Sequence, residues 1–435
     1  MFDRIAFVTE AAVEGGPQDR QKGVFVRFAA AVGLANLGDG IAVVAWAWTA
    51  SLLTRDPLWI AVLPAALRVP WVFFALPSGI LADRVDRRRL IVICDMIRAG
   101  AYGIAGGAIL LNLPLADPAL EGIENTSLYA ALLCLGLLIG CAEVARDNAA
   151  QSMLPAIVPS EHLERSNGLL GGIETVGNEM AGPAVGAFLI ALFLPSPFLV
   201  VALALLLAAL LTASLSGNFR AQARSEEARH WRSELVEGFR FVIAHPMLRI
   251  LVLVTGFWNF FAEMAVIALV LHLQENLSAG ATTYGLILAV GAVGGVVGGV
   301  VVAPLLKAFS TGLLAQWMNL AAAPMFLLIA FAPGPITVAA AMFLFYLSGI
   351  VWNTLSISYR QRVVPDGIRG RVNSVYRLFA WGMMPLGLVV SGAIVNLASG
   401  FFERETALTV PFFVAAFGVA IFAAFSWRPL GRGFQ

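Results

Sequence analysis

Lysine is nearly absent from this chain of 435 residues, and histidine and cysteine are scarce. The two lysines, Lys22 and Lys307, follow Gln and Leu, which excludes a nucleotide-binding loop of the Gly-x4-Gly-Lys-Ser/Thr type. The four histidines form neither a metal-like pair nor a His-x4-Asp motif, so we expect no metal site and no enzyme. Cys94, Cys134 and Cys141 lie in apolar runs, where they are expected to pack as small side chains without redox chemistry.

Charge is also scarce, and apolar residues take its place. Hydrophobic residues make up 59% of the chain and charged residues 13%, and the mean hydropathy is +0.84. Soluble domains are typically about a quarter charged, so the composition indicates an integral membrane protein. Because a spanning helix needs about 20 apolar residues, we expect twelve spans. They cover 24–53, 57–80, 89–112, 128–152, 167–194, 196–215, 248–273, 283–306, 311–333, 335–359, 372–399 and 406–427.

Arginines set the expected orientation of these spans. Arg84 and Arg87 to Arg89 place four guanidinium groups in six residues between the second and third spans. Short loops rich in Lys and Arg stay in the cytoplasm, and an even number of spans returns both termini to that side. Residues 1–23 are polar and of mixed charge, so we expect no cleavable signal peptide and a location in the cell (inner) membrane.

The chain also repeats itself. A Val-Pro pair ending at Pro159, with Arg and Asn six and eight positions later, recurs 206 residues further on at Pro365. Such repeats predict two six-helix halves of the same orientation. The expected organisation comprises a cytoplasmic N-terminal segment, an N-terminal half, a cytoplasmic linker with an amphipathic helix, a C-terminal half and a cytoplasmic tail. These parts cover 1–23, 24–215, 216–247, 248–427 and 428–435.

The loop after the second span carries a family resemblance. It resembles the signature Gly-x3-Asp-Arg-x-Gly-Arg-Lys/Arg of the major facilitator superfamily, with Asp86 where Gly is usual. The matching residues are Gly79, Asp83, Arg84, Arg87 and Arg88. More narrowly, Leu37-Gly38-Asp39, the run from Asp147 to Pro155, and Arg369-Gly370-Arg371 resemble the enterobactin-exporter and macrolide-efflux branch. The resemblance implies an all-α membrane protein with twelve transmembrane helices in two pseudo-symmetric halves.

Carboxylates in the middle of spans one and seven are the first candidate site. Asp39 and Glu263 lie near mid-span, each with an asparagine about one turn earlier, Asn36 and Asn259. Ionisable residues in spans are costly and mark ion or substrate paths. In the superfamily, spans one, four, seven and ten line the central cavity, so the resemblance implies that Asp39 and Glu263 face each other. Asp39 could gain and lose a proton there, or could simply fix helix packing by a hydrogen bond.

Span four places Glu143, Arg146 and Asp147 on one helical face. Glu143 is the deeper residue, and we expect it to face the cavity with Arg146 as its counter-ion. Asp147 is expected to join a gating network with the arginines after Gly79.

Span five holds Glu179 just before Gly182, Pro183 and Gly186. This run resembles the antiporter signature of proton-coupled drug exporters. Gly and Pro permit close helix approach and a kink, and ordinary small-residue packing is the alternative. Arg68 in span two needs a partner or water, whereas Arg377 in span eleven is expected to extend to the membrane surface.

Together these features predict a secondary active transporter that exports a small amphipathic drug or siderophore by alternating access. The energy source would be the proton gradient, without a cofactor. We expect a monomer in the lipid bilayer that binds neither nucleotide nor nucleic acid. The gating loop would latch the cytoplasmic side, with Asp83 resting against the start of span eleven. A lysophospholipid flippase of the same fold is the alternative, and a membrane enzyme or a non-transporting sensor is a different class.

Overall fold

The computed structural model describes residues 17–159, 162–217, 219–220 and 231–434. Within its helices, side chains are described except those of 17–22, 75–76, 79–80, 83, 164–165, 231–235, 366–367 and 369–370. Twelve helical segments in this part of the chain are long and apolar enough to cross a membrane. They coincide with the twelve predicted spans. The largest differences are at the second span, which ends at Phe74, the fourth, which ends at Ile157, and the last, which ends at Gly433.

The N-terminal half is built from the first six spans, and the fifth is interrupted. Residues Val176–Ala181 of that span form a π-helical segment, η2, between two α-helices. The elements are α2 (Pro17–Leu53), α3 (Pro57–Arg84), α4 (Arg87–Leu111), α5 (Thr126–Ile157), α6 (Leu163–Thr175), η2, α7 (Gly182–Leu192) and α8 (Ser196–Ala213).

The C-terminal half repeats this arrangement after the linker helix α9 (Trp231–Ala244). Its elements are α10 (Pro246–Leu271), η3 (His272–Asn276), α11 (Ala281–Ala308), α12 (Thr311–Ala330), α13 (Pro335–Val363), α14 (Asp366–Ala398), α15 (Arg404–Ala407) and α16 (Val410–Gly433).

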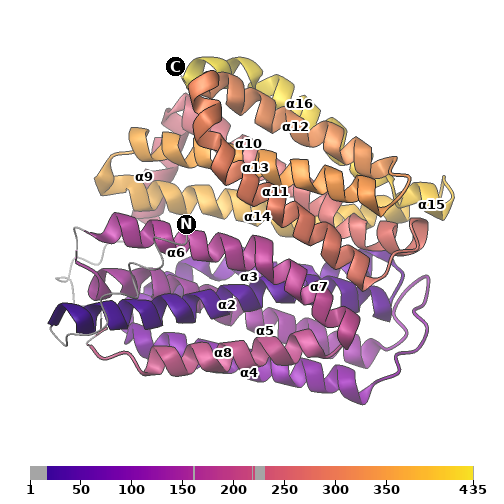
Figure 1. Ribbon diagram of the computed structural model, residues 1–435, viewed down its shortest axis with the longest axis horizontal. Helices are drawn as coiled ribbons and strands as arrows, with labels where there is room; N and C mark the ends of the chain where they lie inside the picture. Colours follow the sequence, from indigo (N-terminus) through magenta and orange to yellow (C-terminus); the bar gives the residue numbers. More distant parts are fainter. Residues whose placement is uncertain (1–16, 160–161, 218, 221–230, 435) are drawn as a thin grey trace.

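The same helix pairs are in contact in both halves. In the first half α3 packs on α5, α4 on α5 and α8, and α2 on α7 and α8. In the second half α11 packs on α13, α12 on α13 and α16, and α10 on α14 and α16. The halves meet mainly where α3 packs on α14 and α7 packs on α11, which are equivalent contacts under exchange of the halves. The expectation of two pseudo-symmetric halves is therefore confirmed (Figure 1).

The two ends of the bundle differ in what they carry. We call the end with the first described turn of α2, the α3–α4 turn and α9 the termini side, at the left of Figure 1. The opposite end, which carries the loop 112–125 and α15, is called the far side.

The arginine-rich turn on the termini side is held by capping and by the segment after α8. Asp86 accepts a hydrogen bond from the backbone N–H of Arg89 at 3.0 Å and so caps the N-terminus of α4. Because Asp is a favoured N-cap residue, it substitutes for the usual Gly. Arg88 donates to the carbonyl of Leu215 at 2.7 Å, and the backbone N–H of Arg87 donates to that of Phe219 at 3.3 Å. The side chains of residues 79 and 83 lie outside the described part, and so does the predicted contact of Asp83.

The apolar residues of the linker helix α9 lie on two sides of the helix. Val242 is buried against the C-terminal half, and Glu237 pairs with Arg371 at the start of α14. Val236, Phe239 and Ile243 are exposed. One face of α9 therefore packs on the protein, while an apolar stripe remains open on the other.

Glycines allow α2 to cross the fifth span at close range. A Cβ at Gly40 would lie 2.5 Å from the carbonyl oxygen of Gly177, and one at Gly186 would lie 2.8 Å from that of Ile41. The Gly182 N–H bonds to the Gly177 carbonyl, a π-helical spacing. Pro183 has no N–H to donate, so the α-helical pattern of hydrogen bonds is also interrupted at this residue. The Gly-Pro run thus serves both close packing and a local change of helix type.

Candidate functional site

An ion pair between α2 and α4 lies at the centre of the N-terminal half. Arg98 donates a hydrogen bond to the Asp39 carboxylate and pairs with it. The Arg98 side chain is fully buried, and that of Asp39 is 7% exposed. On its own helix, Arg98 also lies 3.8 Å from the carboxylate of Asp95. Asp39 is therefore turned into its own half.

The charges continue from α4 to α5. Asp95 is fully buried, and its Oδ1 lies 3.4 Å from Nε of Arg146. Arg146 in turn pairs with Asp147 at 3.1 Å and donates to the backbone carbonyl of Ala31 at 3.3 Å. These contacts form an alternating chain across three spans. We call it the buried charge network, defined as Asp39, Arg98, Asp95, Arg146 and Asp147.

Glu143 lies beside this network with a different partner from the one predicted. Its carboxylate accepts a hydrogen bond from Nε1 of Trp71 at 3.3 Å, and its side chain is buried. It interacts electrostatically with Arg98 and Arg68. The prediction that Arg146 is the counter-ion of Glu143 is wrong, because Arg146 is paired with Asp95 and Asp147. The ion pair between Arg146 and Asp147 places Asp147 in the buried charge network.

Negative groups outnumber positive groups here. The network and Glu143 contain four carboxylates and two guanidinium groups, all close enough to interact. Both oxygens of Asp95 lack a hydrogen-bond donor within the described part of the chain. Uncompensated charge inside a membrane protein is expensive. Additional protons are the smallest species that can neutralise this excess.

Asp95 and Arg98 were missed at the sequence level, although the signal was present. Both lie within the predicted span 89–112, three residues apart on one helical face. The rule that singled out Asp39 and Glu143, that ionisable residues deep in a span are costly, applies equally to them.

A second cluster lies between the two halves. Arg68 of α3 and Glu263 of α10 line the same small cavity, together with Tyr284 of α11. Glu179 of η2 interacts electrostatically with both Arg68 and Glu263. We call Arg68, Glu179 and Glu263 the interface cluster. Glu179 and Glu263 were both named in the predicted cavity set, and both interact electrostatically with Arg68.

Glu263 does not face Asp39, contrary to the implication of the family resemblance. Asp39 is directed toward Arg98, whereas Glu263 shares its cavity with Arg68. The asparagines near these residues serve packing. Asn36 donates to the carbonyl of Val32, and Asn259 to that of Ala380, both at 2.9 Å.

Polar contacts join the halves on the far side. Arg55, which follows α2, donates to the Gln274 side chain and lies 3.9 Å from Glu275. Arg404 of α15 binds Glu275 through two nitrogens, at 2.5 and 2.9 Å, and donates to the Arg55 carbonyl at 2.7 Å. We call Arg55, Gln274, Glu275 and Arg404 the far-side latch. Nearby, Asn396 donates to Asp56 at 2.8 Å.

Another contact between the halves lies nearer the termini side. Arg377 of α14 donates to the Gln151 side chain at 3.1 Å, and its guanidinium stacks 4.2 Å from the Trp381 ring. Trp381 meets Trp71 of α3 edge to face at 4.8 Å. Arg377 is thus held by a partner in the other half and by aromatic rings, in place of the predicted extension to the membrane surface.

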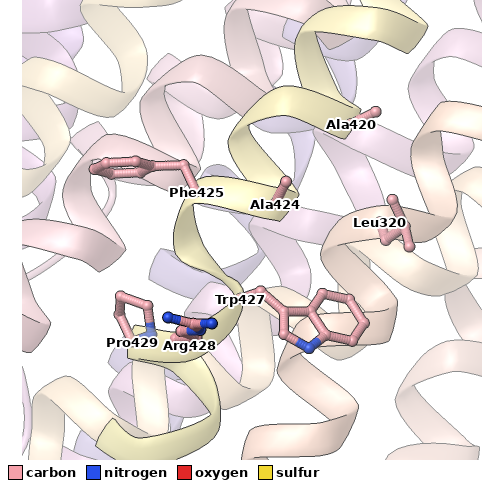
Figure 2. A pocket seen from close by; sticks show the side chains of 7 residues that line it. All are labelled: Leu320, Ala420, Ala424, Phe425, Trp427, Arg428 and Pro429. Carbon is pink, nitrogen blue, oxygen red and sulfur yellow. The ribbon is translucent and has the colours of Figure 1, made fainter.

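A larger hollow is unrelated to these charges. It lies between α12 and α16 of the C-terminal half, and its lining contains one charged side chain, Arg428 (Figure 2). Trp427, Phe425 and Leu320 provide much of the apolar wall. None of the lining residues belongs to the network, the cluster or the latch.

Comparison with known proteins agrees with this architecture. Residues 19–426 match the family described as transmembrane secretion effectors. The chain therefore belongs to this family of the major facilitator superfamily. It is a membrane transporter and not an enzyme.

Relatives of the chain include exporters. It is 27% identical over 400 residues to the multidrug efflux pump Tap of Mycobacterium bovis, covering 87% of this chain and 88% of the relative. It is 25% identical over 308 residues to the enterobactin exporter EntS of Escherichia coli, covering 69% and 68%.

Solved structures support the fold alone, because their sequence identities are low. The nucleoside transporter NupG superposes with a TM-score of 0.71 at 14% identity, covering 94% of this chain and 99% of that one. A bacterial homologue of the iron transporter ferroportin gives 0.69 at 16% identity, covering 96% and 100%.

Proposed function

We propose that the protein exports a small amphipathic molecule in exchange for protons by alternating access. The observation that carries this proposal is the buried charge network with its neighbour Glu143. Four carboxylates share two guanidinium groups, and all of these side chains except that of Asp147, which is 19% exposed, are buried. Protons arriving there reduce the excess charge, and their release restores it.

Asp39 is the proposed entry point for the proton. Its partner Arg98 lies between two carboxylates, Asp39 and Asp95. When Asp39 is protonated, its attraction for Arg98 falls, and Asp95 on the same helix remains as the alternative partner. Protonation would thereby loosen the ion pair that joins α2 to α4. A change in helix contacts driven by charge is the link that coupling requires.

The arrangement of the halves supports alternating access. The far-side latch joins the halves at one end. The equivalent contacts α3–α14 and α7–α11 form a symmetric interface about which the two halves can rotate relative to each other. The arginine-rich turn favours a cytoplasmic termini side. With this orientation, the conformation described here is closed toward the outside by the latch.

The substrate class follows from the relatives by analogy. Tap is named a multidrug efflux pump and EntS an enterobactin exporter. We therefore propose a drug-like or siderophore-like molecule as the exported substrate.

Uptake into everted membrane vesicles with an imposed pH gradient tests this proposal. Vesicles containing the protein should accumulate at least one member of a panel of ethidium, a macrolide and a catecholate siderophore, and a protonophore should abolish the accumulation. Asp39→Asn should remove the gradient-driven part, while Asp117→Asn, a change at an exposed carboxylate of the far-side loop, should not. Undiminished transport by Asp39→Asn or in the presence of protonophore would refute the proposed coupling of export to protons. Movement of a fluorescent lysophospholipid alone would favour a flippase.

A further inference from the structure

The hollow between α12 and α16 has the size of a ligand site. Its volume is about 650 Å³, which is within the range of sites that enclose small molecules. It lies on the side of the C-terminal half that is turned away from the N-terminal half (Figure 1). Ala424 and Phe425 in its wall are exposed, so it opens toward the lipid. A molecule bound there would lie outside the interface between the halves.

Buried hydrogen bonds hold the two helices of this hollow in place. Gln316 of α12 donates to the backbone carbonyl of Trp427 at 2.6 Å, and Asn319 donates to the Ser426 side chain at 3.3 Å. Gln316, Asn319 and Ser426 are all buried. Because these bonds fix the spacing of α12 and α16, the hollow is preformed, as ligand sites usually are.

The hollow is apolar along its length and cationic at one end. Ala420 and Ala424 lie on successive turns of α16, and Arg428 follows one turn later (Figure 2). At 1.5 Å per residue, Ala420 and Arg428 are about 12 Å apart along the helix axis. Arg428 lies close to the end of α16 at Gly433, on the termini side. The charged end is therefore the end nearer the membrane surface.

Two arginines at this end lack partners in the part of the chain that the structure describes. Arg428 and Arg432 are four positions apart, so they lie on one face of α16, and both are exposed. Neither guanidinium has a hydrogen bond, an ion pair or a ring contact among the described residues. Like charges at this spacing repel each other, and a phosphate between them forms charge-assisted hydrogen bonds with both. The pair therefore favours an anionic ligand.

We infer that the hollow binds an anionic phospholipid from the leaflet on the termini side. An acyl chain lies along Ala420 and Ala424, and the phosphate accepts hydrogen bonds from Arg428 and Arg432. The site is separate from the buried charge network and from the substrate path, and it does not depend on the proposed coupling to protons.

The surroundings suit a lipid better than a soluble anion. Trp427 in the wall of the hollow meets Trp317 of α12 edge to face at 5.5 Å. Trp is enriched at the level of the lipid headgroups, and basic pockets between spans bind anionic headgroups on the cytoplasmic side of membranes. A soluble phosphate would leave the apolar wall without a partner.

Native mass spectrometry of the purified protein in detergent tests the inference. It measures the affinity for the first phospholipid bound when phosphatidylglycerol or phosphatidylcholine with the same acyl chains is added. The choline cation offsets the phosphate charge of the second lipid. Each arginine near an anionic headgroup contributes about fivefold, so wild type should prefer phosphatidylglycerol by about twentyfold.

Substitutions at the two arginines test the charged end. Arg428→Gln should lower the affinity for phosphatidylglycerol about fivefold, and Arg428→Gln/Arg432→Gln should remove the preference over phosphatidylcholine. Arg428→Lys keeps the charge and should stay within about twofold of wild type. Arg89→Gln, at another exposed arginine of the termini side, is the matched control and should leave the affinity unchanged.

Filling the hollow tests the apolar end. Ala424→Phe keeps both arginines but occupies the space of the acyl chain. Each displaced CH₂ group costs about fourfold in affinity, so binding of phosphatidylglycerol should fall at least that much. Ala131→Phe, at an exposed alanine of α5, is the matched control. Glycerol phosphate, the soluble headgroup fragment, should not displace the lipid at equal concentration.

Four results would overturn the inference: equal affinity of wild type for the two lipids, unchanged affinity in Arg428→Gln, unchanged affinity in Ala424→Phe, or displacement by glycerol phosphate. The first two would show that these arginines select no anionic lipid, and the last two that the ligand does not occupy the apolar hollow. The melting temperature in detergent checks that each variant is folded. Should Arg428→Gln fail to fold, Arg432→Gln and Ala424→Phe still decide the outcome.

Discussion

The guanidinium of Arg98 pairs with the carboxylate of Asp39 inside the N-terminal half, although the two residues lie on different spans 59 positions apart. The Arg98 side chain is fully buried, and that of Asp39 is 7% exposed. The pair therefore joins α2 to α4, and any change in its charge acts on the packing of these helices.

Removing one member of this pair should destabilise the protein more than removing both. Arg98→Met leaves Asp39 and Asp95 without their shared cation, and breaking a buried pair costs about 3 kcal/mol or more. Asp39→Asn/Arg98→Met removes one charge of each sign and should recover much of that loss. Thermal unfolding in detergent measures the stability, and vesicle uptake measures the activity.

The double variant should remain inactive even where it regains stability. If Asp39 and Arg98 only hold the helices together, uptake will return with the melting temperature. That result would count against a role of the pair in coupling.

Loss of the far-side latch should shift the protein toward opening at that end. Arg55→Ala removes contacts to Gln274 and Glu275, and Arg404→Ala removes those to Glu275 and the Arg55 carbonyl. Partly exposed ion pairs are worth about 1 kcal/mol or less, so the shift in population should be a few fold. Spin labels at Glu121→Cys and Gly400→Cys, with the native cysteines replaced, would report longer distances.

Arg428→Ala is a suitable control for the latch, because Arg428 lines the hollow on α16 and touches no latch residue in the described contacts. Distance distributions identical in wild type and both latch variants would show that these contacts do not hold the far side closed.

Close packing at Gly40 should be sensitive to a single methyl group. A Cβ there would lie 2.5 Å from the Gly177 carbonyl oxygen, so Gly40→Ala forces α2 away from η2. Overpacking of this kind costs about 1–3 kcal/mol. Gly107→Ala on α4 is the matched control, because nothing lies within 4 Å of its added Cβ. The melting temperature should fall only for Gly40→Ala; equal effects would argue against a tight crossing.

The cap at Asp86 should depend on the hydrogen bond of its side chain. Asp86→Ala removes the acceptor for the Arg89 N–H and should cost about 1 kcal/mol, whereas Asp86→Asn should keep most of the stability. Asp86→Gly, the residue usual in the superfamily, should cost only a few tenths. Chemical unfolding of the three variants ranks them, and Asp86→Asn as unstable as Asp86→Ala would contradict the capping role.

Much of the fold could be predicted from sequence because membrane spans follow from local composition. Runs of about 20 apolar residues are legible without knowledge of their neighbours, and so are the repeats around Pro159 and Pro365. The interruption of the fifth span at η2 was not predicted, because a π-helical segment depends on how Gly40 and Gly177 approach one another.

The candidate site was predicted in its residue types and only partly in its pairings. Burial cost alone singled out Asp39, Glu143 and Glu263. Their partners come from other spans: Asp39 meets Arg98, Glu143 meets Trp71. Helical spacing identifies neighbours on one helix, such as Arg146 and Asp147, but carries no information about rotation between helices.

The sequence by itself determined a transporter-like membrane protein with twelve spans, since hydropathy and loop charge are local properties of the chain. Tertiary structure decided which carboxylate meets which guanidinium, that Asp39 turns into its own half, and that Arg68 and Glu263 share a cavity between the halves. The physical reason is that ion pairing depends on contact between side chains far apart in sequence, and only the packing of whole helices brings those side chains together.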